Sequence, residues 1–129
     1  MKFSLPYTSG LIDYIENSSD HVQAQINDIY FSDPAINPTA RHFHDTDFVD
    51  DMWDDLKVLK EEYGIEMNYT MNSSVWKNSV YQDEGKQLLI DNLRTVWDHG
   101  CTMLTFNNLL LLRDTEFRET IPAFKIKLS

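Results

Sequence analysis

Cysteine is almost absent from this chain: Cys101 is the single one among 129 residues. One cysteine cannot form an intrachain disulfide, and the lack of disulfides is typical of cytosolic proteins. No secretory leader precedes the first predicted strand, and no apolar run approaches the roughly 20 residues that a membrane helix needs. We therefore expect a cytoplasmic protein that does not span a membrane.

Basic residues are also scarce. Lysine and arginine together number 11, against 21 aspartates and glutamates, so the formal net charge is −10. Binding to a nucleic-acid backbone needs clustered basic side chains, and this balance therefore argues against a nucleic-acid partner. The acidity favours solubility and leaves a basic substrate or partner possible.

Glycine and proline occur four times each, and they mark the ends of elements. Apolar residues recur at helical spacing over residues 48–63 and again over residues 86–99, where Gly64 and Gly100 are placed to end the two helices. Pro34 and Pro38 lie in a stretch after the second strand that can be neither helix nor strand, so we predict a long loop there. Ser9 is placed to cap a short helix at residues 11–15, and another short helix is predicted at residues 109–112.

Strand-like segments alternate with these helices, at residues 2–7, 27–31, 65–71, 102–106 and 124–129. Such alternation predicts a parallel sheet covered by helices, wound in one direction with strand order 1-2-3-4-5. A closed eight-stranded barrel needs about 250 residues. We therefore expect a single α/β domain over residues 1–129, a parallel (β/α) half-barrel of about five strands with helices on its outer face, resembling half a TIM barrel.

Ligands of β/α folds bind at the carboxyl ends of the strands, and the residues placed there are mostly amides. Arg41 lies in the loop after the second strand, where a guanidinium can clamp a carboxylate or phosphate; the alternative is a surface arginine paired with nearby aspartates. With Asn68, Asn72 and Asn107 it forms the predicted ligand-binding set, a polar pocket that accepts anions. Amides orient a ligand but cannot take up protons at neutral pH, so no catalytic residue is assigned.

His42 and His44 alternate beside Asp45 and are weak candidates for zinc or iron ligands. Three or four well-placed ligands are normally needed, and the alternative is a solvated acidic loop that leads into a helix. Cys101 follows a helix C-terminus, which raises the pKa of a thiol and disfavours a nucleophilic role.

Three segments carry a family resemblance: 65–72 (IEMNYTMN), 97–108 (WDHGCTMLTFNN) and 121–129 (IPAFKIKLS). Together they resemble the N-terminal half of the U32 peptidase-like family. The resemblance implies a TIM-barrel-like fold and, by motif position, ligand-facing roles for Arg41, Asn68, Asn72 and Asn107. Relatives include collagenase-like peptidases and iron–sulfur proteins that support hydroxylation reactions. Their cluster-binding cysteines lie beyond the end of this chain, so no iron–sulfur cluster is expected from this chain alone.

Two functions follow. The chain is either one half of a U32 peptidase-like enzyme lobe or a non-catalytic binding or regulatory module that acts through self-association or a protein partner. A half-barrel leaves the first and fifth strands as unpaired edges, and we expect its inner face to expose Phe3, Leu5, Ile126 or Leu128, depending on register. We therefore expect a homodimer or a complex with a complementary barrel half, the homodimer being favoured for a chain studied alone.

Overall fold

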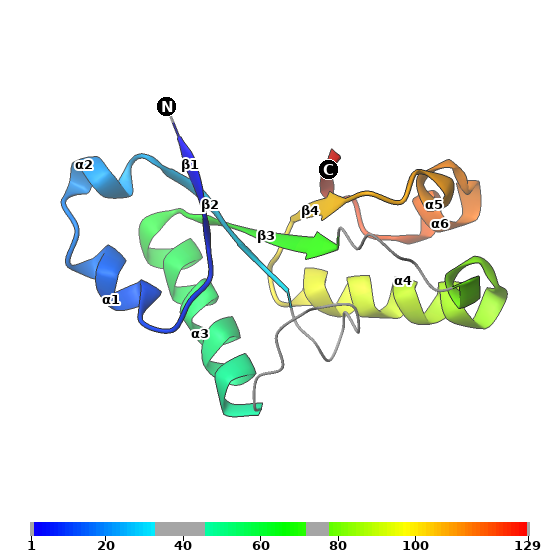
Figure 1. Cartoon of the computed structure of the whole chain (residues 1–129), viewed down its shortest axis with the longest axis horizontal. Helices are drawn as coiled ribbons and strands as arrows, with labels where there is room; N and C mark the ends of the chain where they lie inside the picture. The colour runs from blue at the N-terminus through cyan, green and yellow to red at the C-terminus, as the bar shows by residue number, and fades with distance from the viewer. Residues whose placement is uncertain (1, 33–45, 72–77, 129) are drawn as a thin grey trace.

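The computed structural model describes residues 2–32, 46–71 and 78–128, with side chains from residue 50 onward in the second range. Five strands form one sheet in the order β1-β2-β3-β4-β5, and every neighbouring pair is parallel (Figure 1). The strands are β1 (Phe3–Pro6), β2 (Ile26–Phe31), β3 (Glu66–Met71), β4 (Met103–Phe106) and β5 (Lys125–Leu128). The sheet is open, and the predicted α/β half-barrel with its strand order is confirmed.

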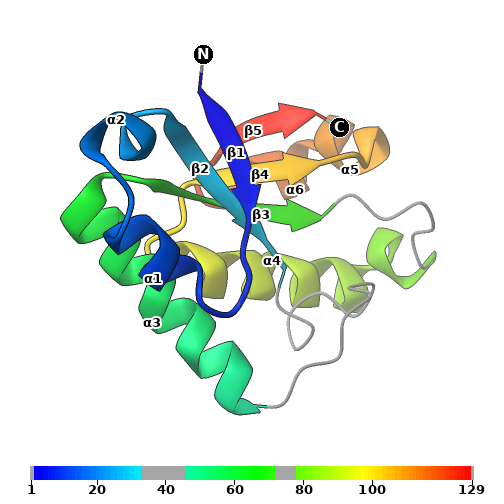
Figure 2. The ribbon, with the colours of Figure 1, turned by 60° about the vertical axis from the view of Figure 1, so that its left-hand side comes forward.

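Two long amphipathic helices connect the middle strands, as the sequence predicts. They are α3 (Thr46–Tyr63) and α4 (Asp83–Asp98), and both lie on the same side of the sheet (Figure 2). Gly64 follows α3 with a φ of 66° and Gly100 follows α4 with a φ of 96°. Because L-residues rarely adopt such angles, glycine lets each helix end and the chain turn directly into the next strand.

The shorter helices differ from the prediction. In α1 (Leu11–Glu16) the N-cap is Gly10, with a φ of 84° and no side-chain cap, so Ser9 does not cap the helix. The sequence also missed a helical turn at α2 (Asp20–Gln23) and a 3-10 turn at η1 (Asn78–Tyr81). Beyond the predicted α5 (Leu109–Arg113), a further short helix, α6 (Thr115–Thr120), follows. Asp114 begins α6 by accepting a hydrogen bond from the Phe117 backbone N–H.

The hydrophobic core lies between the sheet and these helices. Phe31 of β2 contacts Trp53 of α3 edge to face, with ring centroids 5.0 Å apart, and Tyr69 of β3 at 5.5 Å. Phe106 of β4 stacks on Phe117 of α6 at 6.0 Å. Each such side chain contributes about 1.5–3 kcal/mol through burial. In the part of the chain that the structure describes, no helix has the length and apolar content needed to cross a membrane.

The strand register sends apolar and polar side chains to opposite faces. Ile29, Tyr69 and Leu104 face the helices and are fully buried, whereas the neighbours of each in the sequence face the other way. The inner face is consequently mostly polar, and the expectation that Phe3, Leu5, Ile126 or Leu128 lies on it is wrong, because Leu5 pairs with Ile29 and Ile126 with Leu104 in the helix-facing set. Phe3 and Leu128 are 47% and 62% exposed, but both belong to the helix-facing set at the edges of the sheet.

The two edge strands present different backbone groups. The N–H groups of Phe3 and Tyr7 donate to β2 residues or their flanks, so those of Ser4 and Pro6 fall on the open edge of β1. Proline has no N–H, and this position lets it occupy a strand without breaking the ladder. The Lys125 N–H donates to the Thr102 carbonyl next to β4. The backbone N–H groups of Ile126 and Leu128 therefore point to the open edge of β5.

Candidate functional site

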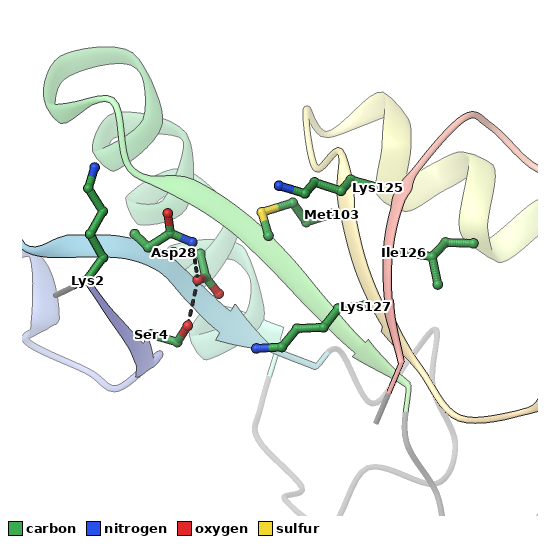
Figure 3. Close-up of a pocket in the computed structure, with 8 residues that line it drawn as sticks. Lys2, Ser4, Asp28, Met103, Lys125, Ile126 and Lys127 are labelled. Carbon is green, nitrogen blue, oxygen red and sulfur yellow. Dashed lines mark hydrogen bonds between the residues drawn. The ribbon is translucent and has the colours of Figure 1, made fainter.

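Polar side chains from four adjacent strands form a continuous hydrogen-bond network on the inner face. Ser4 Oγ donates to Asp28 Oδ1 at 2.6 Å, and Asn68 Nδ2 donates to Asp28 Oδ2 at 3.0 Å (Figure 3 shows the groove beside Ser4 and Asp28). Thr105 Oγ1 donates in turn to Asn68 Oδ1 at 2.9 Å. We call Ser4, Asp28, Asn68 and Thr105 the inner-face network. Each strand from β1 to β4 contributes one member, so the network depends on the pairing of these four strands.

The members of the network are staggered along the sheet. Ser4 is directly opposite Asp28, but Asp28 is opposite Glu66, two residues before Asn68. Asn68 is opposite Met103, again two residues before Thr105. A stagger of this kind between successive strands accompanies the strand tilt of a β/α barrel, so the inner-face network follows barrel geometry.

Asp28 is the charged centre of this network and is only 2% exposed. Burial raises the pKa of its carboxyl, but hydrogen bonds from Ser4, Asn27 and Asn68, together with the charge of Lys127, outweigh burial and lower the pKa overall. The carboxylate is therefore ionised at neutral pH with its oxygens already accepting hydrogen bonds. Such a group orients its neighbours and is a poor general base.

Beside the network lies an open groove with a volume of about 460 Å³. Its lining residues include Lys2, Ser4, Asp28, Met103, Lys125 and Lys127. In Figure 3, Lys125 and Lys127 extend over β3 toward the first two strands, whereas Ile126 points the opposite way. Residues at both edges of the sheet thus line one hollow, as the curvature of a half-barrel requires. We call this hollow the lysine groove.

The three lysines of the groove differ from Lys60 and Lys86 in their surroundings. Lys60 and Lys86 each lie within 4 Å of a carboxylate, at 3.8 Å from Glu66 and 2.5 Å from Asp114. Over residues 2–32, 46–71 and 78–128, Lys2, Lys125 and Lys127 make no ion pair within that distance. Asp28 is the acidic residue in the groove lining. Its oxygens already accept hydrogen bonds from Ser4, Asn27 and Asn68.

The predicted ligand-binding residues are placed only in part. Asn68 was expected at the end of its strand, but it is the third residue of β3 and belongs to the buried network. Asn107 directly follows β4 at its carboxyl end, as predicted, and does not line the lysine groove. The remaining predicted residues, Arg41, Asn72, His42 and His44, lie outside the described residues.

The sequence analysis missed Asp28, Thr105 and the lysines of the groove. Their signal was present as polar residues at alternate positions of the predicted strands, for example Lys125 and Lys127. If the inner face of the sheet were apolar, polar residues would not recur at every second position of these strands.

Other reactive groups lie away from this face. Cys101 is fully buried, and burial raises the pKa of its thiol to about 11. Tyr7, at the carboxyl end of β1, donates to Asp55 of α3 at 2.8 Å. Within the described ranges, no group of three or more histidines, cysteines and carboxylates is placed to hold a metal ion.

The fold has a counterpart among solved structures. No family model and no curated protein matches the chain. The structure titled "Structure of CpGH84B" superposes with a TM-score of 0.61 at 15% sequence identity. The match covers 98% of this chain and 26% of that one, so the chain spans about a quarter of its length. At this identity the likeness concerns the fold alone.

Proposed function

We propose that the chain is a U32 peptidase-like half-barrel lobe whose role is to bind and orient a ligand, and that further strands complete the barrel. The observation that carries this proposal is the inner-face network, a set of mutually hydrogen-bonded polar groups on the open side of the sheet, in which Asp28, Asn68 and Thr105 are buried and Ser4 is exposed. Burying polar groups is costly unless each has a partner, so an already satisfied network is a stable platform for a ligand.

Binding is favoured over catalysis by the chemistry of the inner face. General acid–base catalysis needs a group that changes protonation near the working pH. Asp28 is held ionised by its hydrogen bonds, and its lowered pKa moves it further from neutrality. Cys101 is buried with a raised thiol pKa, which makes it a poor nucleophile.

The completing strands are better supplied by a complementary partner than by a second copy. Eight strands close a β/α barrel, and the described residues of this chain form a sheet of five. A second copy paired through β5 would bring its Lys125 and Lys127 beside those of the first, and one paired through β1 would add Lys2. Like charges directly opposite one another destabilise a strand pair. A partner with acidic side chains at these positions avoids that repulsion.

Charge reversal on β5 tests whether the open edges form an interface. Wild-type chain and the variant Lys125→Glu/Lys127→Glu are each measured alone and as an equimolar mixture, by light scattering at low salt. We expect a monomer for the wild type and a species of twice the mass in the mixture, because opposite charges then meet. Amide hydrogen exchange should show protection of Ile126 and Leu128 in the mixture only, since their N–H groups face the open edge.

Lys57→Ala mixed with wild type is the matched control, because Lys57 is exposed on α3 at the helix side of the sheet. It should leave the mass unchanged. A mixture that stays monomeric at several hundred micromolar, with Ile126 and Leu128 unprotected, would overturn the proposal that these edges receive further strands.

A further inference from the structure

We infer that the lysine groove is a binding site for a small organic polyanion, a molecule with two or more phosphate or carboxylate groups. This inference deepens the proposed function, since it rests on the inner face being the ligand-facing surface, and it names the chemical class of the ligand. Neither of the two described residues of the predicted ligand-binding set, Asn68 and Asn107, is part of the groove lining.

The groove concentrates positive charge on a strongly acidic chain. Three of the 11 basic residues line it, from both sides, on a protein whose formal net charge is −10. Lys125 and Lys127 alternate with Ile126 on β5, so the two ammonium groups point to the same face (Figure 3). Lys2 precedes β1 on the opposite flank. Lysines from both edges of the sheet therefore line the one groove.

The lining of the groove supplies one carboxylate, that of Asp28, for these three lysines. In the part of the chain that the structure describes, none of the three pairs with a carboxylate within 4 Å. Asp28 neutralises at most one charge, and its two oxygens accept hydrogen bonds from Ser4, Asn27 and Asn68. The remaining positive charge is therefore available to a ligand. Enclosing the lysines in a completed barrel raises the need for an anion, because an unpaired buried charge is costly.

The size and lining of the groove indicate a small organic molecule. Its volume of about 460 Å³ falls within the roughly 300–1,000 Å³ of typical small-molecule sites. Met103 is a half-buried apolar residue in the lining, and it provides a surface for a carbon skeleton. Lysine ammonium groups attract anions as point charges without a fixed fork geometry, so both phosphate and carboxylate ligands fit the site.

Calorimetric titration with pyrophosphate and, separately, with citrate tests this inference on the purified chain. We expect saturable binding of at least one probe at low ionic strength and weaker binding as salt is added. The variant Lys125→Ala/Lys127→Ala should weaken that binding at least tenfold. Both lysines are exposed, so the variant should keep the wild-type circular dichroism spectrum. A preference for one probe distinguishes phosphate from carboxylate recognition.

The control is Lys57→Ala/Lys2→Ala compared with Lys57→Ala alone. The first should weaken binding several-fold and the second by less than twofold, because Lys57 lies on the helix side of the sheet. Absence of saturable binding by both probes at millimolar concentration overturns the inference. The same loss for each charge removed by Lys57→Ala and by the β5 variant also overturns it, since net charge alone would then explain binding. Neither result concerns strand pairing, which the mixing experiment tests separately.

Discussion

Asn68 donates its amide N–H to the carboxylate of Asp28 at 3.0 Å, across the β2–β3 pair, and both side chains are almost completely buried. The relationship joins two strands that are 40 residues apart in sequence. It also fixes the orientation of the Asn68 amide, because the amide oxygen must then accept from Thr105.

Replacing Asn68 by alanine should lower the free energy of unfolding by about 1–3 kcal/mol, because Asp28 loses a donor and the buried Thr105 hydroxyl loses its acceptor. Urea denaturation followed by circular dichroism measures this loss. Asn27→Ala is the matched control: Asn27 donates to the same carboxylate at 2.9 Å but is exposed, so the expected loss is roughly 0.5 kcal/mol or less. Equal losses from the two variants would contradict the role given to the network.

Acid should destabilise the wild type more than it destabilises Asp28→Asn. The pKa of Asp28 is lower in the folded chain than its ordinary value of 3.8, so the folded state binds this proton less readily than the unfolded state. The resulting stabilisation is present above the ordinary value and is lost as the pH falls through the folded pKa. Urea midpoints measured between about pH 5 and pH 2 should therefore fall more steeply for the wild type. Parallel curves would show that Asp28 is not held ionised by its surroundings.

Asp114 should be more sensitive to alanine than to serine. Its carboxylate accepts from the Lys86 ammonium at 2.5 Å and from the Phe117 N–H at 3.1 Å. Serine keeps the cap of α6 but loses the charge pair, whereas alanine loses both, so the urea midpoint should fall in the order wild type, Asp114→Ser, Asp114→Ala. Adding Lys86→Met to Asp114→Ser should recover stability, because Lys86 is only 8% exposed and would keep Glu116, at 3.9 Å, as its remaining ion-pair partner. If the double variant were no more stable than Asp114→Ser, the Lys86 ammonium group would have to be in contact with solvent.

Cys101 should resist thiol reagents until the chain unfolds. Burial raises its pKa to about 11, so roughly a thousandth of the thiol is ionised at pH 8. Because the thiolate is the reactive form, modification by a disulfide reagent should be at least about a hundredfold slower in native protein than in 8 M urea. The absorbance of the released thiol follows both rates. Similar rates in the two conditions would mean that Cys101 is accessible in the native state.

Much of the sheet was predictable because its strands and long helices have strong local signals. Gly64 and Gly100 end the helices where a positive φ is required, and the predicted strand bounds differ from the structure by at most one residue at each end. The shorter helix α6 was not predictable in this way. Phe117 is its one fully buried residue, and a single apolar position gives no helical periodicity. Its position depends on packing against Phe106, which is a tertiary contact.

The candidate site was predicted less well, for a physical reason. The rule that ligands bind at the carboxyl ends of strands directed attention to residues after each strand, such as Asn107. Asp28 and Thr105 lie inside strands, and their importance depends on which face each side chain takes. A one-residue change of register moves every side chain to the opposite face, so the face could be decided only with the register known. That is why Ile126 was expected on the inner face and Lys127 was not considered.

Pro6 gives the two edges of the sheet different capacities for growth. Molecules that add head to tail, with β5 of one against β1 of the next, generate an open-ended polymer when the rotation between them does not close. At every such junction one backbone hydrogen bond between the strands would be missing, because Pro6 has no N–H to donate. Lys125 and Lys127 would also lie close to Lys2 of the neighbour. A proline and three lysines therefore act together as a barrier to fibre formation by an otherwise exposed sheet.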